Sequence, residues 1–256
     1  MSWNPAQYAK FSDQRMRPAL DLLASVPSEV VSTVVDLGCG TGSLTEKMAE
    51  RWPSAQVIGV DGSAEMLAEA RQRASSISWV EADLAQWSIP GGADVVYSNA
   101  ALHWLADHER LFPRLADQLR SGGVLAVQMP RNFGAPSHMI AQDLAAEPYW
   151  GGKLVHLIKP APVKEPGFYY ELLVDRFARV DLWETEYIQV LRGKDAVLEW
   201  IKGSWLRQFL AALDADEGAA FERSYAERAA RAYPTRRDGT TILPFRRLFM
   251  MAVRPS

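Results

Sequence analysis

The stretch VVDLGCGTG, from Val34 to Gly42, contains the residues of this sequence best suited to holding a ligand. It places glycine at positions 38, 40 and 42, between a β-branched run and a helical pattern. Glycines at a strand-to-helix turn let the backbone approach a ligand closely, although they also serve ordinary turns. Position 43 is serine, so the dinucleotide-binding pattern G-x-G-x-x-G is incomplete, and the Gly-Lys-Ser/Thr ending of a P-loop is absent.

Three carboxylates accompany this loop and strengthen the interpretation of a ligand site. Asp36 precedes the glycines, while Asp61 and Asp83 end the next two strand-like runs. The carboxyl ends of neighbouring parallel strands meet at one edge of a sheet, so these side chains are expected to line one rim. A carboxylate at the position of Asp61 can accept both hydroxyl groups of a ribose. Any one of the three could instead be a solvated or helix-capping aspartate.

The first half of the chain alternates strand-like and helical patterns, which predicts a doubly wound α/β fold with a mostly parallel sheet. The predicted strands cover residues 30–37, 55–61, 77–83, 93–100 and 122–130. The predicted helices cover residues 43–52, 63–74 and 107–119, with Ser63 as an N-cap and Pro113 inside the last helix.

The pattern changes after Pro130. Residues 131–168 are rich in Pro, Gly and aromatic residues and predict one helix, near 136–146. Further helices are predicted at 165–177, 195–211 and 214–232, and long strands at 178–191 and 240–255. This order indicates a Rossmann-like sheet with an antiparallel final strand and a helical cap inserted between the fifth strand and the last. We expect a single domain over 1–256, with an N-terminal lid or helix (1–30), a cofactor-binding half (31–130), substrate-side insertions (131–240) and a closing strand (241–256).

Composition excludes several classes of protein. The 256 residues carry a net charge of −3, which does not favour binding to nucleic acid or to an anionic membrane. The single cysteine, Cys39, fits a reducing compartment, and we find neither a membrane-spanning run nor a signal-peptide pattern. We therefore expect a cytoplasmic protein whose oligomeric state the sequence leaves open. The four histidines show no metal-ligand spacing, so no metal is expected.

The motifs VVDLGCGTG, EADLAQW (81–87) and SNAALHWL (98–105) together resemble the class I S-adenosylmethionine-dependent methyltransferases. The resemblance implies S-adenosyl-L-methionine as cofactor. Its methionine part would face the loop of Asp36, Gly38 and Gly40. The remaining implied contacts are Asp61 for the ribose, Met66, Asp83 and Leu84 for the adenine, and Asn99 and Ala100 for the methyl-donating end.

A closer likeness extends from Trp3 almost to the C-terminus. The segments WNPAQYAKFSDQRMRPALDLLASVP, SNAALHWLADHERLFPRLADQL, GGVLAVQMPRNFGAPSH and ILPFRRLFMMAV resemble the trans-aconitate 2-methyltransferase family. The resemblance implies methyl transfer to one carboxylate of trans-aconitate, a small tricarboxylate. Carboxylic acids have a pKa of about 4, so this nucleophile is already ionised at neutral pH and needs no general base.

A tricarboxylate in a dry pocket needs cationic and polar partners. Arg246 and Arg247 interrupt an apolar strand, and because adjacent strand residues face opposite sides, one of them is expected to reach the pocket. The other candidates for substrate positioning are His103, which could instead simply pack beside Trp104, and Arg15, Gln128, Asn132 and His138.

The leader WNPAQYAKFSDQRMRP admits two interpretations. It could be an amphipathic helix that packs on the sheet, or a lid in which Tyr8 and Phe11 exclude water from the cofactor while Arg15 faces a carboxylate. Three functions also remain open beside methylation of trans-aconitate: methylation of another small molecule, non-catalytic cofactor binding, and, more remotely, an NAD-dependent dehydrogenase.

Overall fold

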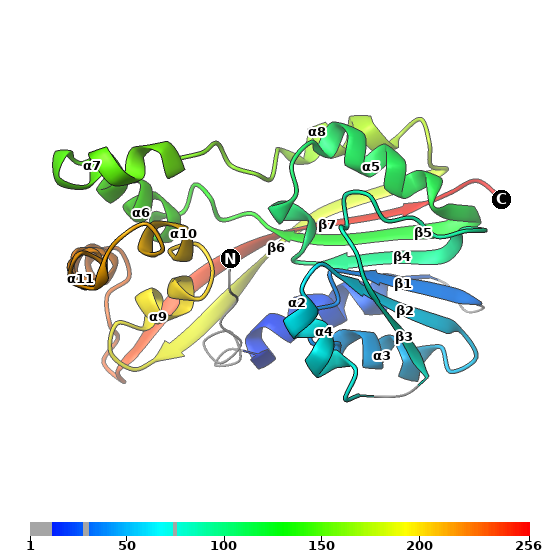
Figure 1. The fold of residues 1–256 in the computed structure, drawn as a ribbon, viewed down its shortest axis with the longest axis horizontal. Coiled ribbons are helices and arrows are strands. Elements are labelled where there is room, and N and C mark those ends of the chain that lie inside the picture. Colours follow the sequence, from blue (N-terminus) through cyan, green and yellow to red (C-terminus); the bar gives the residue numbers. More distant parts are fainter. Residues whose placement is uncertain (1–11, 28–30, 74–75) are drawn as a thin grey trace. The chain divides into compact units, whose positions relative to one another are not determined.

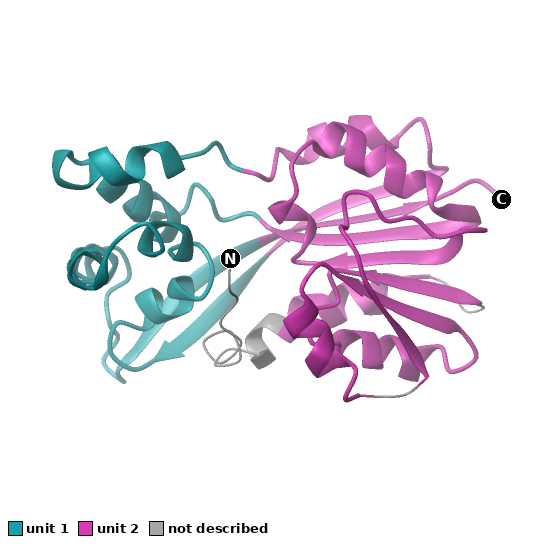
Figure 2. Ribbon diagram, viewed as in Figure 1, with its two compact units in different colours: residues 1–15, 131–161, 186–246 teal, residues 16–130, 162–185, 247–256 magenta. Residues whose placement is uncertain are grey.

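The computed structural model describes residues 12–27, 31–73 and 76–256, with the side chains of 12–15 left out. The chain divides into two compact units (Figure 2). Unit 2 comprises residues 16–130, 162–185 and 247–256, and unit 1 comprises 1–15, 131–161 and 186–246. The strands β6 (Arg179–Arg192) and β7 (Thr240–Val253) contribute residues to both units.

A seven-stranded sheet with the order β3-β2-β1-β4-β5-β7-β6 organises the described chain (Figure 1). Its first five strands are β1 (Thr33–Leu37), β2 (Gln56–Asp61), β3 (Ile77–Glu81), β4 (Ala93–Asn99) and β5 (Leu119–Pro130). These five pair in parallel, and β7 pairs antiparallel with β5. The predicted fold class is confirmed, including the antiparallel final strand.

The strands are buried in the way that parallel sheets require. All five residues of β1 are buried, as are most of β4 and β5, because helices cover both faces of such a sheet. The helices of unit 2 are α2 (Ser12–Ser25, which begins before the unit's first residue), α3 (Ser43–Arg51), α4 (Ala64–Ala70), α5 (His108–Asp117), α8 (Pro166–Leu173) and the 3₁₀ turn η1 (Leu102–Trp104).

Unit 1 is mainly helical. Its elements outside the strands are α6 (Pro136–Ala146), α7 (Pro148–Leu154), η2 (Val155–Leu157), α9 (Ala196–Lys202), α10 (Arg207–Leu210) and α11 (Ala215–Ala232). Asp214 caps α11: its carboxylate accepts from the Glu217 N–H, and the Glu217 side chain accepts from the Asp214 N–H. α11 packs against α6 and α9 within this unit.

Three sequence predictions need correction. The third strand ends at Glu81, so Asp83 lies in the following turn rather than in the strand. The helix predicted over 195–211 is two helices, because Gly203 and Ser204, both weak helix formers, separate α9 from α10. The short helix α7 was not predicted, since its sequence PYWGGKL contains a proline and two glycines. It forms because it buries Trp150 and Leu154, and Trp150 packs edge-on against Phe221 at 5.3 Å.

Candidate active site

The glycine loop joins β1 to α3 and has a tightly constrained backbone. The N–H groups of Gly38 and Cys39 both donate to the carbonyl of Val60, at 2.8 and 3.1 Å. Gly38 has a φ of +81°, and a Cβ added there would lie 2.1 Å from the Cβ of Ala101. Only glycine meets both conditions, so the backbone of the loop lies directly against the turn that follows β4.

Asp61 connects the glycine loop to the end of β2. Its Oδ2 accepts from the Gly40 N–H at 2.8 Å, and its Oδ1 accepts from the Ser63 N–H at 2.9 Å. The side chain of Ser63 in turn accepts from the Met66 N–H, which confirms Ser63 as the N-cap of α4. A carboxylate has about four acceptor positions, so Asp61 retains capacity for the hydroxyl groups of a ligand.

Asp36 lies in a different environment from Asp61. It is 1% exposed and accepts a 2.7 Å hydrogen bond from the hydroxyl of Thr45 in α3. Burial, helped by the nearby charge of Asp61, raises the pKa of Asp36 to about 7, although the Thr45 hydrogen bond opposes the shift. Asp36 is therefore a buried carboxylate that titrates near neutrality.

The turn after β3 carries two of the residues expected at the adenine. Asp83 is exposed, and its Oδ1 accepts from the Ala85 N–H at 2.9 Å. Leu84 is half-buried, with its Cδ1 3.6 Å from the Cβ position that a side chain at Gly38 would occupy. The structure thus brings Leu84 beside the glycine loop. Met66, the expected apolar wall, is half-buried in the first turn of α4.

The turn after β4 has a strained backbone at the expected methyl-donating end. Ala100 adopts a positive φ of 51°, which is rare for a residue with a Cβ, and its N–H donates to the carbonyl of Gln128 at 2.9 Å. His103 is buried in η1, with its ring 4.6 Å from that of Trp104. Trp104 itself is 57% exposed, so this pair lies at the surface of unit 2.

A row of polar side chains crosses three neighbouring strands of unit 2. Asn99 of β4 is in register with Gln128 of β5, which is completely buried. Arg247 of β7 is 4% exposed and donates to Gln128 Oε1 at 3.2 Å. Within the described chain, Asn99 Oδ1 and Gln128 Nε2 are buried without a hydrogen-bond partner. Such atoms cost free energy unless a ligand satisfies them, so we call Asn99, Gln128 and Arg247 the polar row and treat it as a candidate acceptor site.

The two adjacent arginines lie in opposite environments. Arg246 is exposed, while its backbone N–H donates to Asn132 Oδ1 at 2.8 Å and its carbonyl accepts from the Arg131 N–H at 2.9 Å. Arg247 is buried. The sequence predicted that one member of the pair turns inward, and the structure identifies it as Arg247.

Asn132 and His138 belong to unit 1. Asn132 is 4% exposed, and its Nδ2 has no hydrogen-bond partner among the described residues. His138 packs among the rings of Phe133, Trp205 and Phe245, and burial lowers its pKa to about 3. His138 is therefore a neutral part of an aromatic core, and its predicted contact with substrate stays a prediction.

Three of the predicted site side chains lie outside the part of the chain that the structure describes. Tyr8 and Phe11 lie outside the described residues, and the side chain of Arg15 in α2 lies outside them as well. Cys39 is buried, and burial raises the pKa of its thiol, which fits the expectation of a packing residue rather than a nucleophile. In the part of the chain that the structure describes, no group of three or more His, Cys, Asp or Glu side chains could hold a metal ion.

The structure adds residues that sequence reasoning missed. Four such residues contact the backbone or the carboxylates of the site: Thr45, Arg73, Trp79 and Arg114. Thr45 could have been suspected from its place in the first turn of the helix after the loop. The two arginines have no signal in the sequence, because their partners are backbone carbonyls about 30 positions away.

Comparison with known proteins agrees with this geometry. Residues 34–123 match the methyltransferase domain family. A trans-aconitate 2-methyltransferase of Azoarcus sp. is 45% identical over 99% of this chain and 99% of its own. One from Rhodopseudomonas palustris is 43% identical over 98% of this chain and 99% of its own.

Solved structures share the fold. An S-adenosylmethionine-dependent methyltransferase from Mesorhizobium loti has a TM-score of 0.52 at 21% identity, covering 94% of this chain and 99% of its own. Haemonchus contortus phosphoethanolamine N-methyltransferase 2, in complex with S-adenosyl-L-methionine, has a TM-score of 0.57 at 18% identity. That match covers 94% of this chain and 53% of the longer one, so the chain spans about half of that protein. At these identities the likeness concerns the fold alone.

The sheet order, the glycine loop and its carboxylates define a class I S-adenosylmethionine-dependent methyltransferase. The relatives that match over nearly the full length narrow this class, and the chain belongs to the trans-aconitate 2-methyltransferase family. No helix within the described ranges is long and apolar enough to cross a membrane.

Proposed function

We propose that this enzyme transfers a methyl group from S-adenosyl-L-methionine to one carboxylate of trans-aconitate. The products are the monomethyl ester and S-adenosylhomocysteine. The observation that carries the proposal is the polar row, in which the buried guanidinium of Arg247 lies beside Gln128, whose Nε2 is a buried donor without a hydrogen-bond partner among the described residues. Its arrangement suits an anionic acceptor, and the 45% identical relative is named for the same substrate.

The residues of unit 2 fit the proposed cofactor. Gly38 lets the loop backbone lie directly against Ala101, and Gly40 has open space on the side where a Cβ would stand. Asp61 ends β2, and Asp83 lies in the turn that follows the neighbouring strand β3. We assign the methionine part to the loop of Gly38 and Gly40 and to the carboxyl group of Asp36. We assign the ribose to Asp61, and the adenine to Met66, Asp83 and the Leu84 amide. Asn99 and Ala100 flank the methyl-donating end. When bound, the cofactor supplies an electrophilic methyl group that a carboxylate oxygen takes in one in-line displacement.

The chain's own contribution is positioning and the exclusion of water. Arg247 and Gln128 Nε2 together offer charged and neutral donors to one acceptor carboxylate, and a guanidinium matches the planar shape of that group. The reaction joins an anion to a cation and removes both charges, so a dry site favours its transition state. No side chain has to remove a proton, because the acceptor is already ionised.

Three further residues are proposed to position substrate. Asn132 Nδ2 is a buried donor suited to a carboxylate, and His103 and His138 are retained as candidates. The leader residues Tyr8 and Phe11 are proposed to exclude water from the cofactor, and Arg15 is proposed to face a carboxylate of the cofactor or of the substrate. We also propose that the enzyme works in the cytoplasm, which its single cysteine supports.

The decisive experiment offers trans-aconitate, cis-aconitate, isocitrate and citrate side by side with S-adenosyl-L-methionine and measures the methyl esters by mass spectrometry. We expect the highest kcat/KM with trans-aconitate. If another acid is methylated and trans-aconitate is not, the assigned substrate is wrong while the methyltransferase activity stands.

Calorimetry tests the cofactor separately. We expect S-adenosylhomocysteine to bind and NADH not to bind. If the protein binds S-adenosylhomocysteine but methylates none of the four acids, it uses another acceptor or none. Binding of NADH alone would instead indicate a dehydrogenase.

A further inference from the structure

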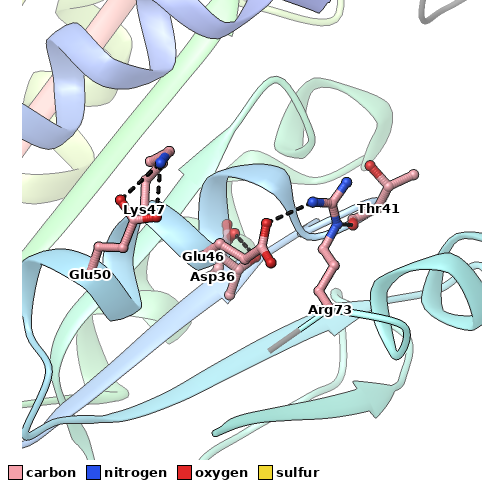
Figure 3. A network of polar contacts seen from close by, with 7 residues as sticks. Asp36, Thr41, Glu46, Lys47, Glu50 and Arg73 are labelled. Atoms are coloured by element: carbon pink, nitrogen blue, oxygen red, sulfur yellow. Dashed lines mark hydrogen bonds and ion pairs between the residues drawn. The ribbon is translucent and has the colours of Figure 1, made fainter. Parts of the chain in front are cut away.

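Two arginines, Arg73 and Arg114, donate to backbone carbonyls of the two turns assigned to the cofactor. Arg73 follows α4, and its Nε donates to the carbonyl of Thr41 in the glycine loop at 2.5 Å (Figure 3). Arg114 lies in α5 and donates to the carbonyls of Leu84 and Trp87, at 2.8 and 2.6 Å. Both side chains are half-buried, and each spans about 30 residues of sequence to reach its partner.

Arg73 constrains the second half of the glycine loop by its hydrogen bond to the Thr41 carbonyl. Its guanidinium also bonds Glu46 in α3 at 2.6 Å, so one side chain links the loop to the helix that follows it. Trp79 confines the same part of the loop, because a Cβ at Gly42 would lie 2.4 Å from its ring. Gly42 has a φ of +81°, so this peptide has few alternative conformations once Arg73 and Trp79 are in place.

Arg114 constrains the backbone of the turn after β3 by hydrogen bonds to its carbonyls. The carbonyl of Asp83 accepts from the N–H groups of Gln86 and Trp87, at 2.9 and 2.8 Å. In a planar trans peptide the C=O and N–H groups point in opposite directions, so the Leu84 N–H is directed away from that turn. By binding the carbonyls of Leu84 and Trp87, Arg114 holds the turn in this orientation.

We propose that Arg73 and Arg114 are positioning residues that set cofactor affinity by holding the two turns in their binding conformation before the cofactor arrives. This inference rests on the proposed cofactor site. A turn that is already ordered loses little conformational entropy when the cofactor binds. A loosened turn loses more, and the free energy of binding becomes less favourable by the corresponding amount. The two arginines act on separate turns, so their effects are expected to be independent.

The test compares Arg73→Met and Arg114→Met, which keep an unbranched chain about as long as the arginine stem and remove the guanidinium donors, with the wild-type enzyme. We expect each to raise the dissociation constant of S-adenosylhomocysteine by about tenfold, equivalent to about 1.4 kcal/mol. With saturating cofactor, kcat and the KM of the acceptor should stay within about twofold, since neither arginine touches the polar row. Arg73→Lys retains a cation and one donor group and should recover part of the affinity.

Lys47→Met is the matched control. Lys47 lies in α3 like Glu46, and its exposed ammonium group pairs with Glu50 at 2.8 Å (Figure 3). We expect the dissociation constant of S-adenosylhomocysteine to be the same for Lys47→Met as for the wild-type enzyme. Unchanged affinity in both arginine variants would overturn the proposal, and so would a rise in acceptor KM equal to the rise for the cofactor.

Hydrogen exchange on the protein without ligand provides a readout that does not depend on the cofactor assignment. Arg73→Met should speed exchange in residues 38–42 and leave 82–87 unchanged, whereas Arg114→Met should do the reverse. Faster exchange throughout the chain would overturn the proposal. If the local changes occur but the wild-type protein binds no S-adenosylhomocysteine, the proposed function has failed instead.

Discussion

Arg246 and Arg247 show how one residue's position in a strand decides its chemistry. Arg247 lies beside Gln128 in the polar row, whereas the side chain of Arg246 is exposed. Successive strand residues face opposite sides, so two chemically identical neighbours enter different environments. Only the buried one can meet a carboxylate away from water, where a charged hydrogen bond contributes most.

We therefore predict that Arg247→Met raises the KM of the acceptor by at least about tenfold, because charged hydrogen bonds contribute about 1.5–3 kcal/mol. The cofactor dissociation constant should change little. Steady-state kinetics at saturating cofactor provide the measurement, with Arg246→Met as the control. Similar effects of the two substitutions would refute the assignment, and Arg247→Lys covers the case in which the methionine variant does not fold.

Asp36 makes a second prediction at the scale of a residue, which concerns stability against pH. Burial is the main cause that raises its pKa from 3.8 to about 7, so between these values the folded state binds more protons than the unfolded state. The contribution of Asp36 to stability is therefore fully present below about pH 4 and is lost as the pH rises through 7. A shift of this size corresponds to a few kcal/mol, at about 1.4 kcal/mol per pH unit.

Asp36→Asn should remove this contribution to the pH dependence. Denaturant unfolding of the ligand-free protein between pH 4 and 8 measures the effect, and the stability difference between variant and wild type should grow in favour of the variant as pH rises. Thr45→Val removes the hydrogen bond that opposes the rise in the Asp36 pKa. In this variant the contribution of Asp36 to stability should therefore be lost at a higher pH than in the wild type. Parallel curves for wild type and Asp36→Asn would contradict the assignment.

At the scale of elements, a buried hydrogen-bonded chain joins α5, α8 and η1 within unit 2. The carbonyl of Leu102 can only accept, so His108 Nε2 carries the proton that it donates at 3.0 Å. His108 Nδ1 then accepts from the Tyr169 hydroxyl at 2.8 Å, and the Tyr169 oxygen accepts from the Lys164 N–H at 3.2 Å. Burial lowers the pKa of His108, which keeps it in this neutral form.

We expect Tyr169→Phe to lower the free energy of unfolding by about 1–3 kcal/mol, because it leaves the buried His108 Nδ1 without this partner and also removes the acceptor of the Lys164 N–H. Tyr170→Phe is the control on the same helix, since Tyr170 is 43% exposed and should change stability by less than about 0.5 kcal/mol. Chemical denaturation measures both. Equal stabilities of the two variants would show that the chain of hydrogen bonds contributes nothing.

The same elements show where sequence patterns succeed. Alternating strand and helix periods predicted β1 to β5 and their helices, and the N-cap Ser63 was read correctly from its residue type. α7 was missed because tertiary packing overrides the weak helix propensity of its sequence, whereas the break between α9 and α10 follows the weak propensity of Gly203 and Ser204, which the prediction overlooked. Trp150 supplies enough buried apolar surface for α7 to form despite its glycines.

At the scale of the whole molecule, the chain passes between the two units more than once, and β6 and β7 each belong partly to both (Figure 2). The change of pattern after Pro130 marks one of these passages, and the return at residue 162 carries no comparable signal. The expected cofactor residues that the structure describes all belong to unit 2. The candidates for substrate positioning are divided, with Arg247 and Gln128 in unit 2 and Asn132 and His138 in unit 1.

The sequence by itself determined the class of fold, the family and the cofactor loop, because these depend on short spacings and on periodicities of two and 3.6 residues. It also predicted that one of two adjacent arginines reaches the pocket, without deciding which. Only the tertiary structure decided that this residue is Arg247, that His138 is part of an aromatic core, and that Arg73 and Arg114 hold the turns of the site. The physical reason is that burial and hydrogen bonding between distant segments depend on packing, which local spacing does not encode.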